Sequence, residues 1–254
     1  MAPVVTRGQI QSVQSFSTLD GPGTRCVVFF QGCPAGCLFC HNPESWAAQG
    51  GEEIAPEALL LRLERFRPFL QTPPGLTLSG GEPLFQPEFA LALATLAQGE
   101  GWHAALDTCG WGPTDSFQQL VQGVDLVMFS IKHPLHPEAL SKLNPASVLA
   151  NWQLLSNFST PVWLRYVLIK GWTDPPEALT ALGRLAKEIP TLERIEIFPY
   201  NSLAESDWED LHRDSPLFHE HSITVTETEV RQAETLIQKT AGLPPRLFPA
   251  FART

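Results

Sequence analysis

The chain has 254 residues, 43% of them hydrophobic, which is enough to build one large hydrophobic core. Acidic residues outnumber Lys and Arg by 27 to 17, and no basic stripe is visible, so nucleic acid is not expected as a partner. No apolar run reaches membrane-spanning length, and the stretch from Met1 to Gly8 lacks the apolar core of a signal peptide, so we expect a cytoplasmic protein with no membrane partner.

Strand-like apolar runs alternate with helix-like stretches along most of the chain. The predicted strands are residues 25–31, 76–79, 103–107, 124–131, 162–169 and 194–198. The predicted helices are residues 56–66, 87–96, 174–189 and 226–239. This alternation predicts an α/β fold with a parallel sheet, either an incomplete barrel or an open doubly wound sheet. We expect a single domain over residues 1–254, with its core between about residues 15 and 240.

A tight group of cysteines follows the first predicted strand: Cys33, Cys37 and Cys40. Four cysteines would close the coordination of a four-iron cluster, so three of them leave one iron without a protein ligand. The spacing therefore predicts a [4Fe-4S] cluster at which chemistry takes place. Such a trio also argues against a disulfide framework and for a reducing compartment. The other two cysteines, Cys26 and Cys109, are expected to be small buried residues.

Two other metal sites could use the same residues. Cys37 to His41 matches the Cys-x-x-Cys-His pattern of covalent haem attachment, which leaves Cys33 unexplained. A structural zinc ion could use the three cysteines and His41, although a histidine directly beside Cys40 makes joint tetrahedral coordination awkward.

Polar residues gather where the later strands end, and in a parallel barrel this edge carries the site. Gly80 and Gly81 follow the second strand, where paired glycines either form a turn or let the backbone approach a ligand. Glu82 could anchor this loop or accept a hydrogen bond from an ammonium group. Asp107 is either a cap or a ligand at the end of the third strand, and Lys132, after the fourth, could bind a carboxylate.

Arg165 lies inside the fifth predicted strand, between apolar neighbours. A charged side chain is rarely buried without a partner. Arg165 is therefore expected either to face a ligand or to pair with a carboxylate such as Glu196.

Several motifs together resemble the radical S-adenosylmethionine superfamily and, within it, the glycyl-radical-enzyme-activating family of the pyruvate formate-lyase type. They are the segments 20–25, 29–33, 40–42, 79–82, 107–108, 165–166 and 198–200. The resemblance implies a partial (β/α)6 TIM-like barrel. It also implies an oxidoreductase that reductively cleaves S-adenosylmethionine to a deoxyadenosyl radical, which takes a hydrogen from one glycine of a partner glycyl radical enzyme.

The resemblance implies roles for individual residues. Cys33, Cys37 and Cys40 would hold the cluster. The cofactor-binding residues would be Phe39 and His41 beside the adenine, Gly80 and Gly81 at the methionine amino group, Lys132 at the carboxylate, and further Cys40, Asp107, Ser130, Arg165 and Asn201. The residues facing the partner's glycine loop would be Asp20, Gly21, Pro22 and Gly23. The chain has no second cysteine-rich insert, so the electron donor would be a flavodoxin or ferredoxin.

Two positions depart from the family pattern. Ser130 stands where the family has an Asp that helps to form a monovalent-cation site with Asp107, Thr108 and the Met128 carbonyl, so this site is expected to be weakened. Asn201 stands where the family has His. The alternatives are a radical S-adenosylmethionine enzyme acting on a small molecule, such as a deazapurine precursor, and a non-catalytic metal-binding protein.

Overall fold

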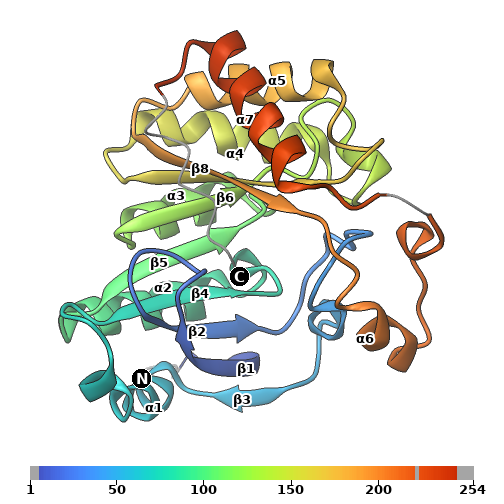
Figure 1. Cartoon of the computed structure of the whole chain (residues 1–254). Coiled ribbons are helices and arrows are strands. Elements are labelled where there is room, and N and C mark those ends of the chain that lie inside the picture. The colour runs from blue at the N-terminus through green and yellow to red at the C-terminus, as the bar shows by residue number, and fades with distance from the viewer. Residues whose placement is uncertain (1–5, 221–222, 245–254) are drawn as a thin grey trace.

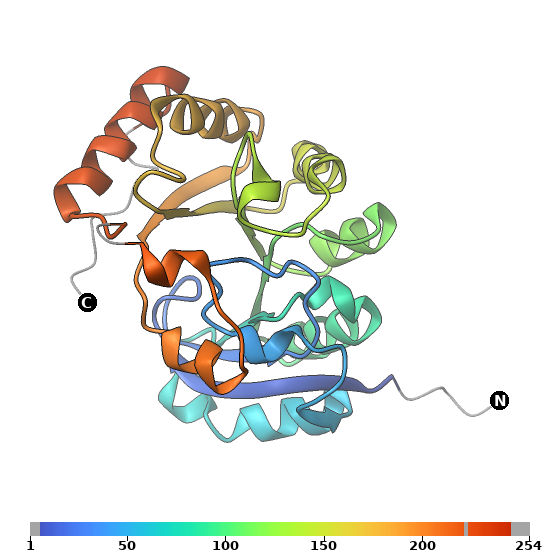
Figure 2. The ribbon, with the colours of Figure 1, turned by 90° about the vertical axis from the view of Figure 1, so that its right-hand side faces the viewer.

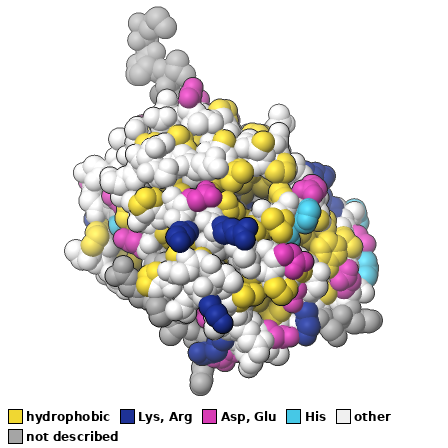
Figure 3. All heavy atoms as spheres, turned by 90° about the horizontal axis from the view of Figure 1, so that it is seen from above, with side chains coloured by type: hydrophobic (Ala, Val, Ile, Leu, Met, Phe, Trp, Pro, Cys, Tyr) yellow, Lys and Arg dark blue, Asp and Glu magenta, His cyan; other side chains and the backbone are white. Residues whose placement is uncertain are grey.

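The computed structural model describes residues 6–220 and 223–244. Residues 1–5, part of the stretch in which no signal peptide is predicted, lie outside the described residues. Among the described helices, none is long and apolar enough to cross a membrane. On the face seen in Figure 3, Lys and Arg side chains are interspersed with Asp and Glu, so no patch of a single sign covers this face.

The architecture is one eight-stranded sheet in the order β3-β1-β2-β4-β5-β6-β7-β8. Six of the strands run parallel: β2 (Arg25–Phe30), β4 (Gly75–Gly80), β5 (His103–Thr108), β6 (Leu126–Ser130), β7 (Val162–Leu168) and β8 (Leu192–Pro199). Each of them coincides with a predicted strand. β1 (Gly8–Ser17) and β3 (Glu52–Ile54) add an antiparallel edge beside β2. Because β3 and β8 end the sheet without pairing with each other, the incomplete barrel is confirmed.

Helices cover the outer side of the curved sheet (Figures 1 and 2). They are α1 (Pro56–Glu64), α2 (Pro87–Gly99), α3 (Thr114–Gln122), α4 (Pro145–Leu154), α5 (Pro176–Lys187) and α7 (Glu227–Ala241). Short 3-10 helices are η1 (Pro43–Trp46), η2 (Arg67–Phe69), η3 (Pro83–Phe85), η4 (Pro137–Ala139), η5 (Leu155–Asn157) and η6 (Pro216–His219). The predicted helices are confirmed as α1, α2, α5 and α7, whereas α3 and α4 were not predicted.

Alternation along the strands separates the hydrophobic core from the polar site. In β4, Leu76 and Leu78 are fully buried in the main hydrophobic cluster under the helices. Their neighbours Thr77 and Ser79 point to the opposite, inner face, because successive side chains of a strand alternate. The arrows of the parallel strands in Figure 1 point to one end of the sheet, where the loop after β2 and helix α6 (Glu205–Asp210) lie, whereas β1 runs the opposite way. Inner-face polar groups are therefore presented at this end.

Candidate functional site

A cavity of about 590 Å³ lies at the end of the sheet where the parallel strands have their C-terminal residues. This end of the sheet faces the viewer in Figure 2. Most of the predicted site residues line it: Cys33, Cys37, Phe39, Cys40, His41, Gly80, Gly81, Asp107, Ser130, Lys132 and Asn201. Arg165 does not line the cavity. Of the four predicted partner-facing residues, Gly21 does so, whereas Asp20, Pro22 and Gly23 do not.

Backbone and side-chain hydrogen bonds from distant segments hold the cysteine loop in place. The backbone N–H of Leu38 donates to the Leu140 carbonyl over 2.9 Å, and Ser215 Oγ donates to the Leu38 carbonyl over 2.7 Å. Trp208 Nε1, from α6, donates to the Cys40 carbonyl over 2.9 Å. The loop carries no regular secondary structure of its own, so these contacts hold its backbone in place.

The three cysteines of the loop are free thiols in a poorly solvated place. Burial raises the pKa of Cys33 to about 12 and that of Cys40 to about 11, and it also raises the pKa of Cys37. Without a metal, these groups would stay protonated at neutral pH. A metal centre deprotonates the thiols it binds and supplies the missing positive charge.

The donor set fits an iron–sulfur cluster better than a single metal ion. Among the residues that the structure describes, no three His, Cys, Asp or Glu side chains gather around a point where one metal ion could bind. Three thiols that ligate three different irons need not converge on one point. His41, the fourth ligand of the zinc alternative, is exposed. The zinc site therefore gains no geometric support.

The two glycines at the end of β4, Gly80 and Gly81, are required by close packing of the backbone. Gly80 has a φ of +90°, and a Cβ atom there would lie 2.4 Å from the Cα of Phe29. A Cβ on Gly81 would lie 2.5 Å from the carbonyl oxygen of Gly32. This close approach joins the Gly-Gly turn to the segment that leads into the cysteine loop, so both border the same cavity.

Glu82 anchors this turn, one of the two roles considered for it. Its carboxylate is buried and accepts hydrogen bonds from Thr108 Oγ1 over 2.7 Å and from the backbone N–H of Cys109 over 2.8 Å. Burial raises the pKa of Glu82, while these hydrogen bonds oppose the shift. Glu82 thus ties the end of β4 to the end of β5.

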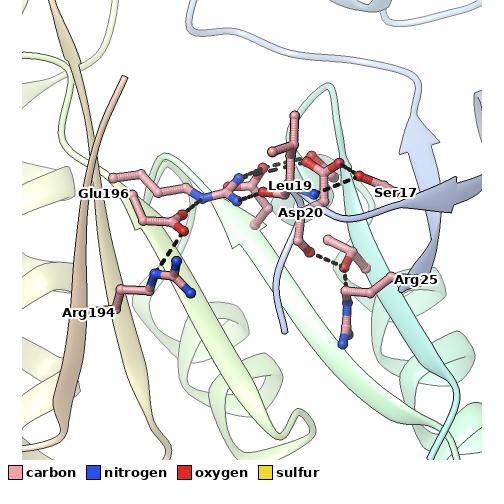
Figure 4. A network of polar contacts seen from close by, with 10 residues as sticks. Ser17, Leu19, Asp20, Arg25, Arg194 and Glu196 are labelled. Atoms are coloured by element: carbon pink, nitrogen blue, oxygen red, sulfur yellow. Dashed lines mark hydrogen bonds and ion pairs between the residues drawn. The ribbon is translucent and has the colours of Figure 1, made fainter. Parts of the chain in front are cut away.

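Charged side chains meet on the inner face of the sheet, where Asp107 and Glu196 line the cavity. Figure 4 shows this network of polar contacts. Arg165 Nε donates to Glu196 Oε2 over 2.9 Å, and its Nη1 donates to Asp107 Oδ2 over 3.3 Å. Ser79 Oγ also donates to Asp107 Oδ2, over 2.8 Å. The expectation that Arg165 pairs with a carboxylate such as Glu196 is confirmed. Contact between Arg165 and a cofactor stays a prediction.

The loop before β2, residues 18–24, is held against the inner face of the sheet. Arg165 Nη2 donates to the Leu19 carbonyl over 2.6 Å, and Thr77 Oγ1 donates to the Asp20 carbonyl over 2.6 Å. Arg25 Nη1 donates to the Pro22 carbonyl over 3.1 Å. Figure 4 shows Leu19 and Asp20 in the middle of this network, with Arg25 on one side and Glu196 and Arg194 on the other.

Lys132 brings a positive charge to the cavity wall. Its ammonium group lies over the ring of Phe39, 5.7 Å from the ring centre. Burial lowers the pKa of Lys132, but the negative charges that Cys37 and Cys109 carry when ionised and the charge of the Asp107 carboxylate outweigh it, so the net pKa is raised. The side chain therefore stays protonated and can bind an anionic group.

Several cavity residues were missed by sequence reasoning. They are Trp46, Arg194, Glu196 as a wall residue, Tyr200 and Glu234. Arg194 lies over the ring of Trp163, 4.5 Å from its centre, and pairs with Glu196 over 3.2 Å. Arg194 and Glu196 are two residues apart on β8, so they lie on the same face of the strand. This spacing was the signal that could have identified both as inner-face residues. The Tyr200 hydroxyl is buried and has no hydrogen-bond partner among the described residues.

Comparison with known proteins gives matches along nearly the whole chain. Residues 27–182 match the model of the radical SAM superfamily. The pyruvate formate-lyase-activating enzyme of Clostridium pasteurianum is 36% identical over 213 residues, 83% of this chain and 89% of that protein. The enzyme of the same name from Streptococcus mutans is 36% identical over 245 residues, 91% of this chain and 90% of that protein.

Solved structures share the fold at much lower sequence identity. A radical SAM methyltransferase from Sphaerobacter thermophilus aligns with a TM-score of 0.61 and 17% identity, over 90% of this chain and 66% of that one. A domain of a pyruvate-formate lyase-activating enzyme from Bacteroides vulgatus aligns with a TM-score of 0.52 and 19% identity, over 65% of this chain and 94% of that one.

Proposed function

Because this chain belongs to the radical SAM superfamily and, within it, to the family of pyruvate formate-lyase-activating enzymes, we propose that it activates a glycyl radical enzyme. The observation that carries the proposal is that one cavity is lined by the three cysteines, by the Gly-Gly turn and by Lys132. An iron–sulfur cluster and S-adenosylmethionine, which carries the amino and carboxylate groups of methionine, can therefore be held side by side. Together they supply reductive cleavage of S-adenosylmethionine and removal of a hydrogen atom from a glycine of the partner.

The cysteine loop is the proposed cluster site, with Cys33, Cys37 and Cys40 as ligands. An apolar shell that includes Ala35, Leu140 and Leu217 surrounds the loop. Such a shell limits the access of water and lowers the local dielectric, which strengthens every charge interaction within it. It also protects a reactive radical from side reactions.

The proposed cofactor contacts follow the charges of the cavity wall. Lys132 would bind the methionine carboxylate by a charge-assisted hydrogen bond. The turn at Gly80 and Gly81 would receive the amino group, and Phe39 and His41 would flank the adenine. Ser130 and Asn201 would complete the wall, together with Asp107 and, beneath it, Arg165.

Protein partners are proposed for two steps. The loop from Asp20 to Gly23 would face the glycine loop of the partner enzyme; its neighbours Thr18 and Leu19 line the cavity, and Leu19 is exposed. A flavodoxin or ferredoxin would supply the electron. A monovalent cation near Asp107 would bind weakly, because Ser130 adds no charge and the Asp107 carboxylate already accepts from Ser79 and Arg165.

A reconstitution experiment tests the proposal. After anaerobic loading with iron and sulfide, the chain should hold about four irons and form deoxyadenosine from S-adenosylmethionine under dithionite. Mixed with pyruvate formate-lyase from Streptococcus mutans, it should then generate the doublet electron paramagnetic resonance signal of a glycyl radical. Deoxyadenosine formation without a glycyl radical on this or any other glycyl radical enzyme would favour a small-molecule substrate instead. Loss of iron on gel filtration would favour a non-catalytic metal-binding protein.

A further inference from the structure

The indole of Trp46 donates a hydrogen bond to the sulfur of a cysteine in the cluster loop. Its Nε1 lies 3.2 Å from Cys40 Sγ, and the backbone N–H of Asn42 reaches the same sulfur over 3.4 Å. Within the described residues, no other side chain donates to the sulfur of Cys33, Cys37 or Cys40. The three proposed ligands are therefore not equivalent.

The surroundings of Trp46 lock the direction of this N–H group. The ring packs edge to face against Trp208, with centroids 5.0 Å apart. The guanidinium of Arg213 lies over the ring of Trp46, 4.7 Å from the ring centre. The backbone is fixed as well, because Cys33 N donates to the Trp46 carbonyl over 3.4 Å and Gln31 Nε2 donates to the Ala47 carbonyl over 2.8 Å. A donor held in this way needs no reorganisation when charge on the sulfur changes.

We propose that Trp46 is a positioning residue that sets the reduction potential of the iron–sulfur cluster through its hydrogen bond to Cys40. When the cluster takes up one electron from a low-potential donor, negative charge on its sulfur ligands increases. A donor at the sulfur then binds more strongly, so it stabilises the reduced state more than the oxidised state. The hydrogen bond therefore raises the potential, and its loss lowers it. This inference rests on the proposed cluster site and not on the identity of the protein partner.

Trp208 supplies a matched control within the same aromatic pair. Its Nε1 donates to the carbonyl oxygen of Cys40 over 2.9 Å, not to the sulfur. Trp208 is also the more deeply buried of the two indoles. Replacing either tryptophan by Phe removes one indole N–H beside Cys40 and disturbs the same packing, but only the change at Trp46 removes a bond to a ligand atom.

The experiment compares the unmodified chain with Trp46→Phe and Trp208→Phe after anaerobic loading. Iron and sulfide per chain are measured first, and the midpoint potential is then obtained by a redox titration followed by the electron paramagnetic resonance of the reduced cluster. In Trp46→Phe we expect the reduction equilibrium constant to fall about tenfold, which is about 59 mV for a one-electron couple. In Trp208→Phe we expect a shift of less than about 20 mV on the same scale.

A second variant covers the case in which Trp46→Phe does not hold the cluster. Replacing Trp46 by β-(3-benzothienyl)alanine keeps the two-ring shape and substitutes sulfur for the N–H group, so a lower potential in that variant supports the proposal. An unchanged potential in either loaded Trp46 variant, or an equal shift in Trp208→Phe, overturns it. An unmodified chain that holds no four-iron cluster overturns both this inference and the proposed function, whereas a loaded cluster with an unchanged potential overturns the inference alone.

Discussion

Arg165 on β7 and Glu196 on β8 are register partners, and their side chains meet on the inner face of the sheet with 2.9 Å between Nε and Oε2. Both side chains are about one-tenth exposed, at 10% and 11%. The same guanidinium also bonds the Leu19 carbonyl over 2.6 Å. The pair therefore connects the open edge of the barrel to the loop that precedes β2.

Glu196→Gln should lower the free energy of unfolding by about 1–3 kcal/mol, because it weakens a buried charged pair while Arg165 keeps its contact with Asp107. Urea denaturation measures the change. The control is Glu193→Gln, an exposed position on the same strand, which should change stability by less than about 0.5 kcal/mol. Equal effects of the two variants would mean that the pair adds nothing to stability.

Replacing any one of Cys33, Cys37 and Cys40 by Ala should abolish the visible absorbance of the cluster and the cleavage of S-adenosylmethionine. Each of the three thiolates is needed to hold the cluster, because the fourth iron already has no protein ligand. Absorbance after reconstitution and deoxyadenosine formation are the two measurements.

The controls for this prediction are Cys26→Ala and Cys109→Ala. Cys26 lies in the main core under the helices. Cys109 is a buried residue that borders the cavity just after β5 but lies outside the cysteine loop, so both variants should keep the cluster and the activity. Retention of the cluster by Cys33→Ala together with its loss in Cys109→Ala would show that the ligands are misassigned.

Most of the parallel strands could be predicted because they contain a run of buried apolar residues, as in 26–28 or 126–129. The edge strand β1 could not, because shifts of register between Ile10 and Ser12 and between Gln14 and Ser17 interrupt the alternation that marks a half-buried strand. Helix α4 begins at an Asn144 cap followed by Pro145, a weak signal in a proline-rich chain, and α3 begins without a side-chain cap.

The cavity itself followed from motifs at the strand ends, and pairing with a carboxylate such as Glu196 was one of the two expectations for Arg165. The sequence left open whether Arg165 pairs with Glu196 or faces a ligand, and the register of β7 and β8 brings the two side chains together. In the same way, Trp46 and Trp208 come from segments 162 positions apart in the numbering and meet beside Cys40. Contacts of this kind depend on tertiary packing, which sequence periodicity does not contain.

Lys132→Ala should weaken binding of S-adenosylmethionine by about 10- to 150-fold. A charge-assisted hydrogen bond to the methionine carboxylate contributes roughly 1.5–3 kcal/mol, and each 1.4 kcal/mol is a factor of ten. Titration calorimetry on the reconstituted protein gives the affinity. Lys187→Ala, at an exposed position in the last turn of α5, should leave it unchanged. An unaltered affinity for S-adenosylmethionine in Lys132→Ala would show that Lys132 does not bind the cofactor.

Cleavage of S-adenosylmethionine by the unmodified chain should depend little on sodium or potassium. Ser130 supplies no negative charge, and the Asp107 carboxylate is already bonded to Arg165. Affinity for a hard cation follows the charge of its oxygen ligands, so Ser130→Asp should introduce alkali-cation dependence and tighten cofactor binding.

Deoxyadenosine formation under dithionite, with choline in place of the alkali cations, measures this dependence. Ser130→Asn, which has the size of Asp without its charge, should behave like the unmodified chain. Strong activation of the unmodified chain by potassium would show that other groups replace the missing carboxylate.

His133 should make the protein less stable as the pH falls. Its Nδ1 accepts hydrogen bonds from the backbone N–H groups of Leu135 and His136, over 3.1 and 2.8 Å, so the ring has to be neutral at this atom. Burial, aided by the neighbouring His136, lowers the pKa of His133 below its ordinary value of 6.5. The unfolded chain therefore binds the proton more readily, and the free energy of unfolding decreases as pH drops through about 6.5, by at most about 1.4 kcal/mol per pH unit for this one group.

In His133→Asn the amide oxygen can accept the same two bonds without titrating, so urea denaturation between about pH 5 and 8 should show a flatter profile of the free energy of unfolding against pH. An identical pH profile in both proteins would contradict this assignment.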